Sequence, residues 1–482
     1  MKISEILSKF TQLKLIGKDV EVEDLSIKAQ ETKEGDLFIA LPGAKSHGLH
    51  WEREALQRGA RAILSDRVGN EKTSYIIGEN LRDILSSFSF EFYGNPQKDL
   101  KIIGITGTTG KTTTAHMISY ILSNFKKVSF FGTTHYQIGK NSFPSPYTTP
   151  EAPLLAKLFS LSRKEGVEYI VMEVSSHSLK GKRVEALRFD RAIFTNIGRD
   201  HLDFHITEED YFSSKFHLIH LLKENGVLIY NFDDKKFQGF KDLKIEKIPF
   251  SLKKKEKVHL ISFKQSMEGM EGFVSINGKS YPFKIPFIGI YNLENFLAAL
   301  SCLYSLNFPP EEVLEIFKEI PPVKGRLEKV EGGQKFPVIV DYAHTPEGFE
   351  KVFSTIKEIY NLKIITVFGA GGDRDRGKRR ILGEIAGRNS EIVILTTDNP
   401  RSEDPAKICE EIKEGVFSSG QDKVLIILDR QEAIKKAIAL ANQNFAVLIL
   451  GKGHENYQII QDKVFPFSDV KAALRAIKEI YP

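Results

Sequence analysis

Hydrophobic positions recur along the chain with two different periods, and the alternation between them predicts strands followed by helices. Apolar runs typical of buried strands lie at 36–41, 60–65, 100–105, 169–174, 192–194, 337–340, 363–368, 392–396 and 446–450. Helical spacing is found at 51–58, 115–122, 210–219 and 289–300, whereas 245–285 reads as short strands and turns. Buried strands alternating with helices favour parallel sheets covered by helices, the α/β class.

The length of 482 residues predicts about three domains of ordinary size. A turn-rich polar stretch at 93–99 and a stiff Ile-Pro-Pro break at 320–322 mark two boundaries. We therefore expect a small N-terminal α/β domain at 1–98, a central phosphate-loop ATPase domain with a parallel sheet at 99–324, and a C-terminal Rossmann-like α/β domain at 325–482.

Composition narrows the class of protein. The net charge of +5, from 68 basic and 63 acidic residues, is too small for a nucleic-acid binder and suits an anionic small substrate. Two cysteines, Cys302 and Cys409, exclude a disulfide framework. With no apolar run long enough to span a membrane, no secretory signal and no repeat, we expect a cytoplasmic monomer.

The stretch Gly104 to Thr114 combines close-set glycines, a lysine and hydroxyls between a strand and a helix, and this combination predicts a phosphate-binding loop. Small residues let backbone N–H groups approach a polyphosphate. Lys111 can reach its outer oxygens and Thr112 can hold Mg²⁺. The strict motif would place glycine at position 105, where this chain has isoleucine, so the loop is a variant.

Two further polar clusters follow apolar strands. Glu173 to His177 places a carboxylate at a strand end, where phosphate-loop enzymes hold Mg²⁺, although Ser175 and Ser176 could equally cap the next helix. In the second cluster, His201 and His205 have a zinc-like spacing, but no suitable third ligand lies nearby and the oxygen-rich surroundings favour a harder cation.

In the C-terminal third, glycine-containing or polar loops follow each strand, and such loops share one edge of a parallel sheet. The loop at 369–380 has the wrong spacing for a dinucleotide fingerprint, and recognition of an anion or carboxylate by Arg374 and Arg379 suits it better. Lys215, taken alone, reads as a solvated surface lysine.

Together these stretches resemble the Mur ligases, the ATP-dependent amino-acid-adding enzymes of peptidoglycan precursor synthesis, and most closely their muramyl-tripeptide synthetase branch. The resemblance covers nearly the whole chain. Its most specific stretches are Thr106 to Thr112, Glu173 to His177, Asn196 with Asp200 and His201, Gly289 to Asn295, Gly325 with Arg326, Asp341 to His344, Gly371 to Asp375, Asp398 to Arg401 and Gly451 to Glu455.

The resemblance implies roles for individual residues. ATP would be held by Gly107, Thr108, Thr109, Gly110, Lys111, Thr112, Thr113, Asn292, Arg326 and Asp341. Magnesium would be held by Thr112, Glu173, His201 and Lys215, the last as a carbamylated lysine. Together with Lys111, the residues Glu173, His201 and Lys215 would form the catalytic set. The UDP-muramyl dipeptide would be bound by Thr148, Thr149, Ser175 and Arg183. The incoming amino acid would be bound by Arg374, Asp398, Asn399, Pro400, Arg401, Gly451 and Glu455.

The amino acid follows from charge. Meso-diaminopimelate has a distal carboxylate and a distal amine, for which Arg401 and Glu455 are the matching partners, whereas lysine lacks the carboxylate. Two departures from the family pattern affect the uridine contacts: Lys28-Ala-Gln30 replaces an Asp-Ser-Arg, and Gly181 replaces a glutamine.

The reaction implied is phosphoryl transfer to the substrate's terminal glutamyl carboxylate, then attack by the amine on the acyl phosphate, in cell-wall synthesis and hence in cell shape and division. His201 and His344 are candidate bases by residue type only. The competing interpretations are a lysine-adding version, a folylpolyglutamate-type ligase and a nucleotide-switch ATPase. A dinucleotide-dependent oxidoreductase would need a fingerprint that the chain lacks.

Overall fold

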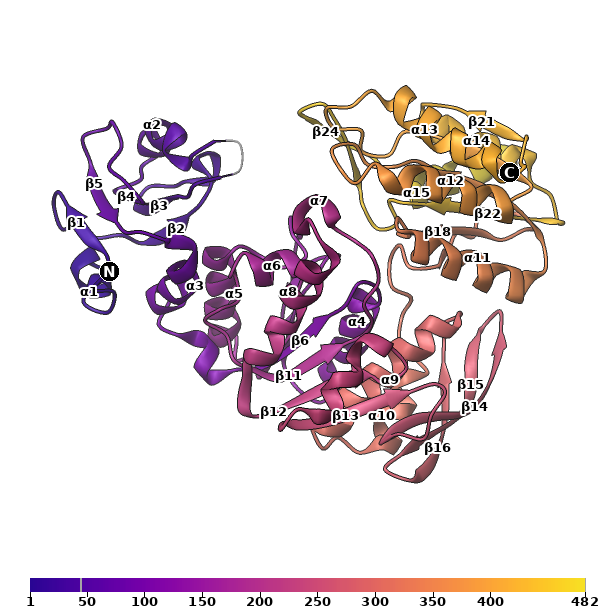
Figure 1. Ribbon diagram of the computed structural model, residues 1–482, viewed down its shortest axis with the longest axis horizontal. Helices are drawn as coiled ribbons and strands as arrows, with labels where there is room; N and C mark the ends of the chain where they lie inside the picture. The colour runs from indigo at the N-terminus through magenta and orange to yellow at the C-terminus, as the bar shows by residue number, and fades with distance from the viewer. Residues whose placement is uncertain (44–45, 482) are drawn as a thin grey trace. The chain divides into compact units, whose positions relative to one another are not determined.

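The computed structural model describes residues 1–43 and 46–481 of the chain. It divides into two compact units, each assembled from segments that are separate in sequence. The first comprises Met1–Thr106, Leu122–Ala192 and Ser213–Leu228, and the second comprises Gly107–Ile121, Ile193–Phe212 and Ile229–Pro482. Figure 1 labels most of the helices and many of the strands.

The first unit begins with a small sheet of order β1-β5-β4-β3-β2, in which only β1 runs antiparallel to its neighbour. Its strands are β1 (Lys14–Ile16), β2 (Asp24–Ser26), β3 (Asp36–Ala40), β4 (Ala62–Ser65) and β5 (Ser74–Ile77). The accompanying helices are α1 (Ile3–Leu7), α2 (Glu52–Gln57) and α3 (Leu81–Phe92). Every residue of β3 and β4 is buried, as expected for parallel strands covered on both faces.

The longest sheet in the described part of the chain has the order β16-β15-β14-β13-β12-β11-β6-β10-β7-β8-β9. In the first unit, β10 (Tyr169–Glu173) lies parallel between β6 (Lys101–Thr106) and β7 (Val128–Phe131), and β8 (Tyr136–Ile138) and β9 (Asn141–Phe143) continue antiparallel. The other strands are β11 (Phe189–Phe194), β12 (Leu222–Asn231), β13 (Glu246–Ser251), β14 (Val258–Ser266), β15 (Gly269–Ile276) and β16 (Lys279–Ile285). The helices are α4 (Lys111–Ser123), α5 (Ala152–Lys164), α6 (Ser176–Lys180), α7 (Leu202–His205), α8 (Glu208–His220), α9 (Ile290–Ser305) and α10 (Pro310–Phe317).

The last part of the second unit is built on a sheet of order β17-β18-β22-β19-β20-β21, parallel except for β17. Its strands are β17 (Glu328–Lys329), β18 (Val338–Asp341), β19 (Lys363–Phe368), β20 (Ile392–Leu395), β21 (Val424–Ile426) and β22 (Phe445–Leu450). The helices are α11 (Pro346–Tyr360), α12 (Gly377–Asn389), α13 (Pro405–Ser418), α14 (Arg430–Leu440) and α15 (Asp469–Ile480), and a hairpin of β23 (Tyr457–Ile460) and β24 (Lys463–Pro466) precedes α15.

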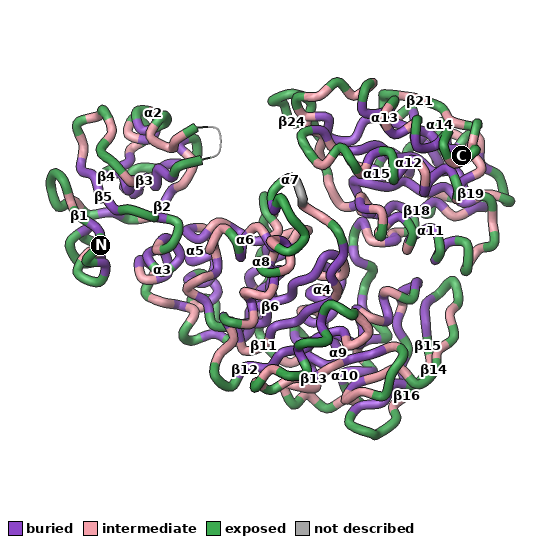
Figure 2. Tube along the Cα trace, viewed as in Figure 1, coloured by how far each residue is buried: buried purple, intermediate pink, exposed green. Residues whose placement is uncertain are grey.

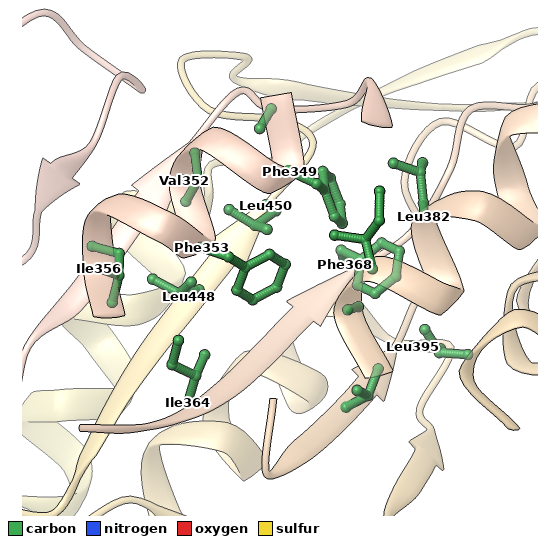
Figure 3. Close-up of a cluster of buried hydrophobic side chains, with 14 of the residues drawn as sticks. Phe349, Val352, Phe353, Ile356, Ile364, Phe368, Leu382, Leu395, Leu448 and Leu450 are labelled. Atoms are coloured by element: carbon green, nitrogen blue, oxygen red, sulfur yellow. The ribbon is translucent and has the colours of Figure 1, made fainter. Parts of the chain in front are cut away.

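Two hydrophobic clusters cover the two faces of this sheet. One joins Phe349 and Phe353 of α11 and Leu382 of α12 to alternate strand residues such as Ile364 and Leu448, as Figure 3 shows. The other uses the intervening strand positions with α14 and α15. Since successive strand side chains point to opposite faces, the apolar runs of β19 and β22 supply both clusters. Figure 2 shows these strands as buried.

The fold class predicted from the sequence, α/β with parallel sheets, is therefore confirmed. The boundaries at residues 98 and 324 stay a prediction. Among the described residues, no helix is both long enough and apolar enough to cross a membrane.

Candidate active site

The loop between β6 and α4 has the backbone that its sequence predicts. Gly107 has a φ of 150° and Gly110 a φ of 86°, values that favour glycine. A Cβ atom on Gly107 would lie 1.9 Å from Thr195 Oγ1, and one on Gly110 would lie 2.3 Å from Asn295 Oδ1. Both glycines are therefore required by backbone conformation and by close neighbours.

Side chains from other segments of the second unit brace this loop. Asn196 accepts a hydrogen bond from the Thr109 N–H at 2.9 Å and donates to the Thr109 carbonyl at 3.2 Å. The Lys111 ammonium donates to the carbonyls of Gly107 at 2.7 Å and Thr108 at 3.0 Å. The lysine amine is thus held against the loop whose phosphate ligand it is expected to contact.

Two side-chain amides of α9, Asn292 and Asn295, make different contacts. Asn292 donates to the Ile288 carbonyl at 2.8 Å and accepts from Asn295 Nδ2 at 2.9 Å. Asn295, in turn, accepts a hydrogen bond from Thr114 Oγ1 at 3.3 Å. The amide that contacts the phosphate-loop helix is therefore Asn295, while Asn292, the residue predicted to bind nucleotide, orients it.

Arg326 and Asp341 lie in the same unit as the loop. Arg326 donates to Thr112 Oγ1 at 3.3 Å and stacks its guanidinium 4.6 Å from the centre of the Tyr342 ring. Asp341 accepts backbone N–H bonds from Leu327 and Ala343, both at 2.7 Å. Burial raises the pKa of the Asp341 carboxyl. Asp341 thus orders the strand-end turn, whatever else it binds.

Glu173 ends β10 opposite Ile105, so this carboxylate lies beside the strand that leads into the phosphate loop. It is fully buried and accepts from the Thr133 N–H at 2.7 Å and from Thr133 Oγ1 at 3.1 Å. Thr133 Oγ1 also lies at a hydrogen-bonding distance of 3.1 Å from Thr148 Oγ1. The predicted metal carboxylate and a predicted substrate hydroxyl therefore share one neighbour.

The other predicted UDP-substrate residues gather at the same strand end. Thr149 Oγ1 donates to the Glu173 carbonyl at 2.9 Å and accepts the Ser175 N–H at 3.0 Å. Arg183 donates to the Thr149 carbonyl at 3.1 Å and pairs with Glu151 at 2.5 Å. Ser175 also caps α6 by accepting the Ser178 N–H at 3.1 Å, so the capping alternative is correct for this side chain.

Lys215 on α8 is 1% exposed, so the interpretation as a solvated surface lysine is wrong. His201 has a left-handed backbone with a φ of 55° and lies 3.3 Å from Asp200. Burial opposes ionisation of Asp200, but nearby positive charge, foremost that of His201, outweighs it and lowers the pKa to about 2. The described residues contain no cluster of three or more His, Cys, Asp or Glu side chains that could hold a metal.

Apart from Arg374, the residues predicted for the amino acid lie in the loops that follow β20 and β22. Arg401 has a φ of 51°, and its guanidinium donates to the Gly372 carbonyl at 2.7 Å. The Gly372 N–H donates to the Asn399 carbonyl at 2.9 Å. The loops after β19 and β20 are thereby tied together around the arginine.

Glu455 and its neighbours complete this site. Its Oε2 atom accepts hydrogen bonds from Asn399 Nδ2 at 2.9 Å and from Lys452 Nζ at 2.8 Å. Gly451 has a φ of 107°, and a Cβ there would lie 2.7 Å from Asp398 Oδ2. Asn399 thus links Glu455 to the loop around Arg401, and the backbone of Gly451 lies close against Asp398.

Arg374 and Arg379 differ in their surroundings. Arg374 is exposed on the loop after β19. Arg379 is 1% exposed and pairs with Glu403 at 2.9 Å and Glu411 at 2.8 Å. The prediction that Arg379 recognises a ligand anion is therefore wrong, because two carboxylates of the protein already occupy its guanidinium.

The sequence interpretation gave no binding role to four residues that the geometry singles out: Asn196, Tyr211, Asn295 and Lys452. Tyr211 lies 2.9 Å from Thr108 Oγ1, and Lys452 is fully buried. For Asn196, Asn295 and Lys452 a signal existed, since each falls within a stretch that carried the family resemblance.

The loop geometry and the strand-loop-helix arrangement place the chain among the phosphate-loop nucleotide-binding proteins. Family models match in three stretches: the Mur ligase middle domain at residues 105–303, the Mur ligase glutamate ligase domain at 325–453, and the Mur ligase catalytic domain at 21–89.

Curated relatives match over nearly the full length. A UDP-N-acetylmuramoyl-L-alanyl-D-glutamate--2,6-diaminopimelate ligase of Syntrophomonas wolfei is 37% identical over 99% of both chains. One of Aquifex aeolicus is 40% identical over 95% of this chain and 93% of that one. A solved structure with the same name has a TM-score of 0.65 at 29% identity, covering 99% of both chains. The chain belongs to the Mur ligase family, with its N-terminal, central ATPase-type and C-terminal domains.

Proposed function

We propose that the protein is the ATP-dependent ligase that adds meso-2,6-diaminopimelate to UDP-N-acetylmuramoyl-L-alanyl-D-glutamate. The observation that carries the choice of amino acid is the placement of Arg401 and Glu455 on either side of Asn399. Glu455 accepts a hydrogen bond from the Asn399 side chain, and Arg401 donates to Gly372, whose N–H donates to the Asn399 carbonyl. A guanidinium suits the distal carboxylate of diaminopimelate and a carboxylate suits its distal amine. The relatives named above carry the same activity in their names.

The chemistry begins with a carboxylate, which is a poor acyl donor until it is phosphorylated. ATP would transfer its γ-phosphoryl group to the glutamyl carboxylate, forming an acyl phosphate and ADP. The diaminopimelate amine would then attack the acyl carbon, expel phosphate and lose a proton. Lys111 would balance the charge that develops on the phosphoryl group, since its ammonium is already held at the loop.

Magnesium fits the donor chemistry of these residues. Thr112, Glu173, His201 and a carbamylated Lys215 would hold it, and bound Mg²⁺ neutralises charge on phosphate oxygens. Two observations support this assignment: Glu173 is a fully buried carboxylate, and Lys215 is a buried lysine. A buried lysine is costly as a cation, and carbamylation would make it an anionic oxygen ligand.

The remaining substrate contacts follow the same division. Thr148, Thr149, Ser175 and Arg183 would bind the UDP-muramyl dipeptide, and Asn292, Arg326 and Asp341 would complete the nucleotide site. Arg374, exposed near the Arg401 loop, would add a second cation for a carboxylate of the amino acid. We place the reaction in the cytoplasm, where the protein would act as a monomer in cell-wall synthesis and thereby in cell shape and division.

Phosphate release by the purified protein with ATP, Mg²⁺ and UDP-muramyl-alanyl-glutamate tests this proposal. The arms contain meso-diaminopimelate, lysine or no amino acid. We expect release with diaminopimelate alone. Release with lysine alone would assign the lysine-adding reaction instead, and release that ignores all three arms would replace the ligase with an ATPase.

A further inference from the structure

Lys452 lies at the centre of the predicted amino-acid site without a role in the assignment above. It follows β22 between two glycines and is fully buried. Burying an ammonium is unfavourable unless nearby groups compensate its charge. The residues that compensate the charge of Lys452 therefore indicate what this lysine does.

Three predicted amino-acid ligands surround the Lys452 ammonium. Its Nζ atom donates to Glu455 Oε2 at 2.8 Å and to Asn399 Oδ1 at 3.2 Å, and it lies 3.8 Å from Asp398 Oδ1. These residues belong to the loops after β20 and β22, two strands separated in the sheet by β19. Lys452 thus joins two loops that the strands alone do not bring into contact.

The bonds fix how Glu455 is presented. Asn399 accepts from Lys452 and from the Ile459 N–H at 2.9 Å, so its amide nitrogen is turned toward Glu455. The Asn399 amide nitrogen and the Lys452 ammonium both donate to the same carboxylate oxygen of Glu455, Oε2. Among the described residues, none donates a hydrogen bond to Glu455 Oε1, and this oxygen can therefore accept one from the amine of a ligand.

The buried negative charge of Glu455 requires a nearby cation to stabilise it. Asp398, Lys452, Arg430, Tyr342 and Tyr457 are the titratable or charged groups that interact with it. Burial and the negative charge of Asp398 raise the pKa of Glu455, and Lys452 opposes both. Arg430 is engaged by Asp469 at 2.7 Å and 2.8 Å, so Lys452 is the cation bonded directly to Glu455.

We propose that Lys452 is a positioning residue, the internal counter-ion that keeps Glu455 ionised and aims Oε1 at the distal amine of the incoming amino acid. The inference rests on the proposed ligase function. One ammonium already neutralises part of the Asp398 and Glu455 pair, so the site is matched to a single additional ammonium group. Lys452 itself does not contact the reacting atoms.

The test measures kcat and KM for meso-diaminopimelate, with KM for ATP as an internal reference, in the full-length protein. Lys452→Met should raise KM for the amino acid by about 10- to 100-fold, the usual cost of losing a supporting contact. It should also move the acid limb of kcat/KM upward by about one pH unit, because an unpaired Glu455 holds its proton more tightly. KM for ATP should stay within about twofold of the wild-type value, since Lys452 contacts no residue of the phosphate loop.

Two further variants separate positioning from a merely structural role. Lys452→Arg keeps the positive charge, so its acid limb should stay at the wild-type pH even if KM rises. In a Glu455→Gln background, adding Lys452→Met should change KM by less than about threefold, because the carboxylate that Lys452 bonds directly is gone and only the more distant Asp398 remains. Lys423→Met, which removes a surface partner of Glu391, is the matched control and should leave all parameters unchanged.

Each outcome decides the matter. Wild-type protein without amino-acid-dependent phosphate release would overturn the ligase function and this inference with it. An active wild type with an unaltered Lys452→Met variant, or with equal losses in the Glu455→Gln background, would overturn the counter-ion role alone. If Lys452→Met does not fold, the arginine variant decides, and an acid limb that moves with it contradicts the proposal.

Discussion

Arg401, which we propose commits the site to one amino acid, shows how a backbone conformation can fix a side chain. Its backbone lies in the left-handed region, with a φ of 51°, and its guanidinium is held by the Gly372 carbonyl. Such a conformation is uncommon for a residue with a side chain and persists only where its surroundings impose it. The turn therefore holds the guanidinium in place before any ligand arrives.

Replacing Arg401 tests this commitment. Arg401→Ala should raise KM for diaminopimelate by roughly 10- to 100-fold, because a charge-assisted hydrogen bond contributes about 1.5–3 kcal/mol. Steady-state kinetics with varied amino acid and varied ATP would measure it. Arg388→Ala, on the exposed side of α12, is the control, and an Arg401→Ala variant with unchanged KM would assign the carboxylate to another residue such as Arg374.

At the scale of elements, the buried Arg379 side chain joins α12 to α13 and to the loop before it through ion pairs with two partly exposed glutamates. Arg379 and the two carboxylates that it bonds connect segments more than twenty residues apart. The Arg379 side chain, first of all, lowers the pKa of Glu403 to about 2, below its ordinary value of 4.5. The pair therefore stabilises the fold fully above about pH 4.5, and this contribution is lost as the pH falls toward 2.

Arg379→Met should lower the free energy of unfolding at pH 7 by about 1.5–3 kcal/mol, the usual contribution of a hydrogen bond to a charged group, because the carboxylates of Glu403 and Glu411 are partly exposed to water. Urea denaturation at pH 7 and at pH 3 would measure the loss, which should be smaller at the lower pH. Arg475→Met removes an exposed partner of Glu479 and should cost less than about 1 kcal/mol. Equal losses at both pH values would argue that packing, not charge, is what Arg379 contributes.

The phosphate loop is the second element for which we make a prediction, because it requires glycine at position 110. Gly110→Ala should raise KM for ATP by at least about 100-fold, because its Cβ would meet Asn295 as well as straining a backbone that favours glycine. Gly139 has a φ of 54°, but a Cβ atom added there would have no other atom within 4 Å, so Gly139→Ala shares the strain without the clash. Nucleotide titration of both variants should show weak binding only in the first.

At the scale of the whole molecule, ligand binding should increase the stability of the folded protein. A ligand that binds only the folded protein stabilises it by about 2.7 kcal/mol at a concentration 100 times its Kd. We expect ATP with Mg²⁺ to raise the melting temperature and an excess of EDTA to abolish most of that rise. The melting temperature of Lys111→Ala should change little when ATP and Mg²⁺ are added. A rise in the wild-type melting temperature that EDTA does not reduce would contradict the magnesium assignment.

The sequence by itself determined the fold class, the phosphate loop and the strand-end loops. These features have local signals: a loop of glycines and hydroxyls between a strand and a helix can be recognised in one continuous stretch, even though distant side chains brace it. The expected strands at 169–174 and 363–368, for example, agree with β10 and β19 to within one residue. The family resemblance had the same origin, because each of its motifs is a continuous stretch.

Only the tertiary structure decided which side chains are buried and what they touch. Lys215 and Arg379 look alike in sequence as solvated or ligand-binding cations, yet both are buried, and Arg379 is neutralised by glutamates on other segments. Asn295 reaches the phosphate-loop helix across 181 positions of sequence, and Lys452 reaches Asn399 across 53. Such contacts depend on how strands order themselves in a sheet, and the periodicity of a single strand carries no record of its neighbours.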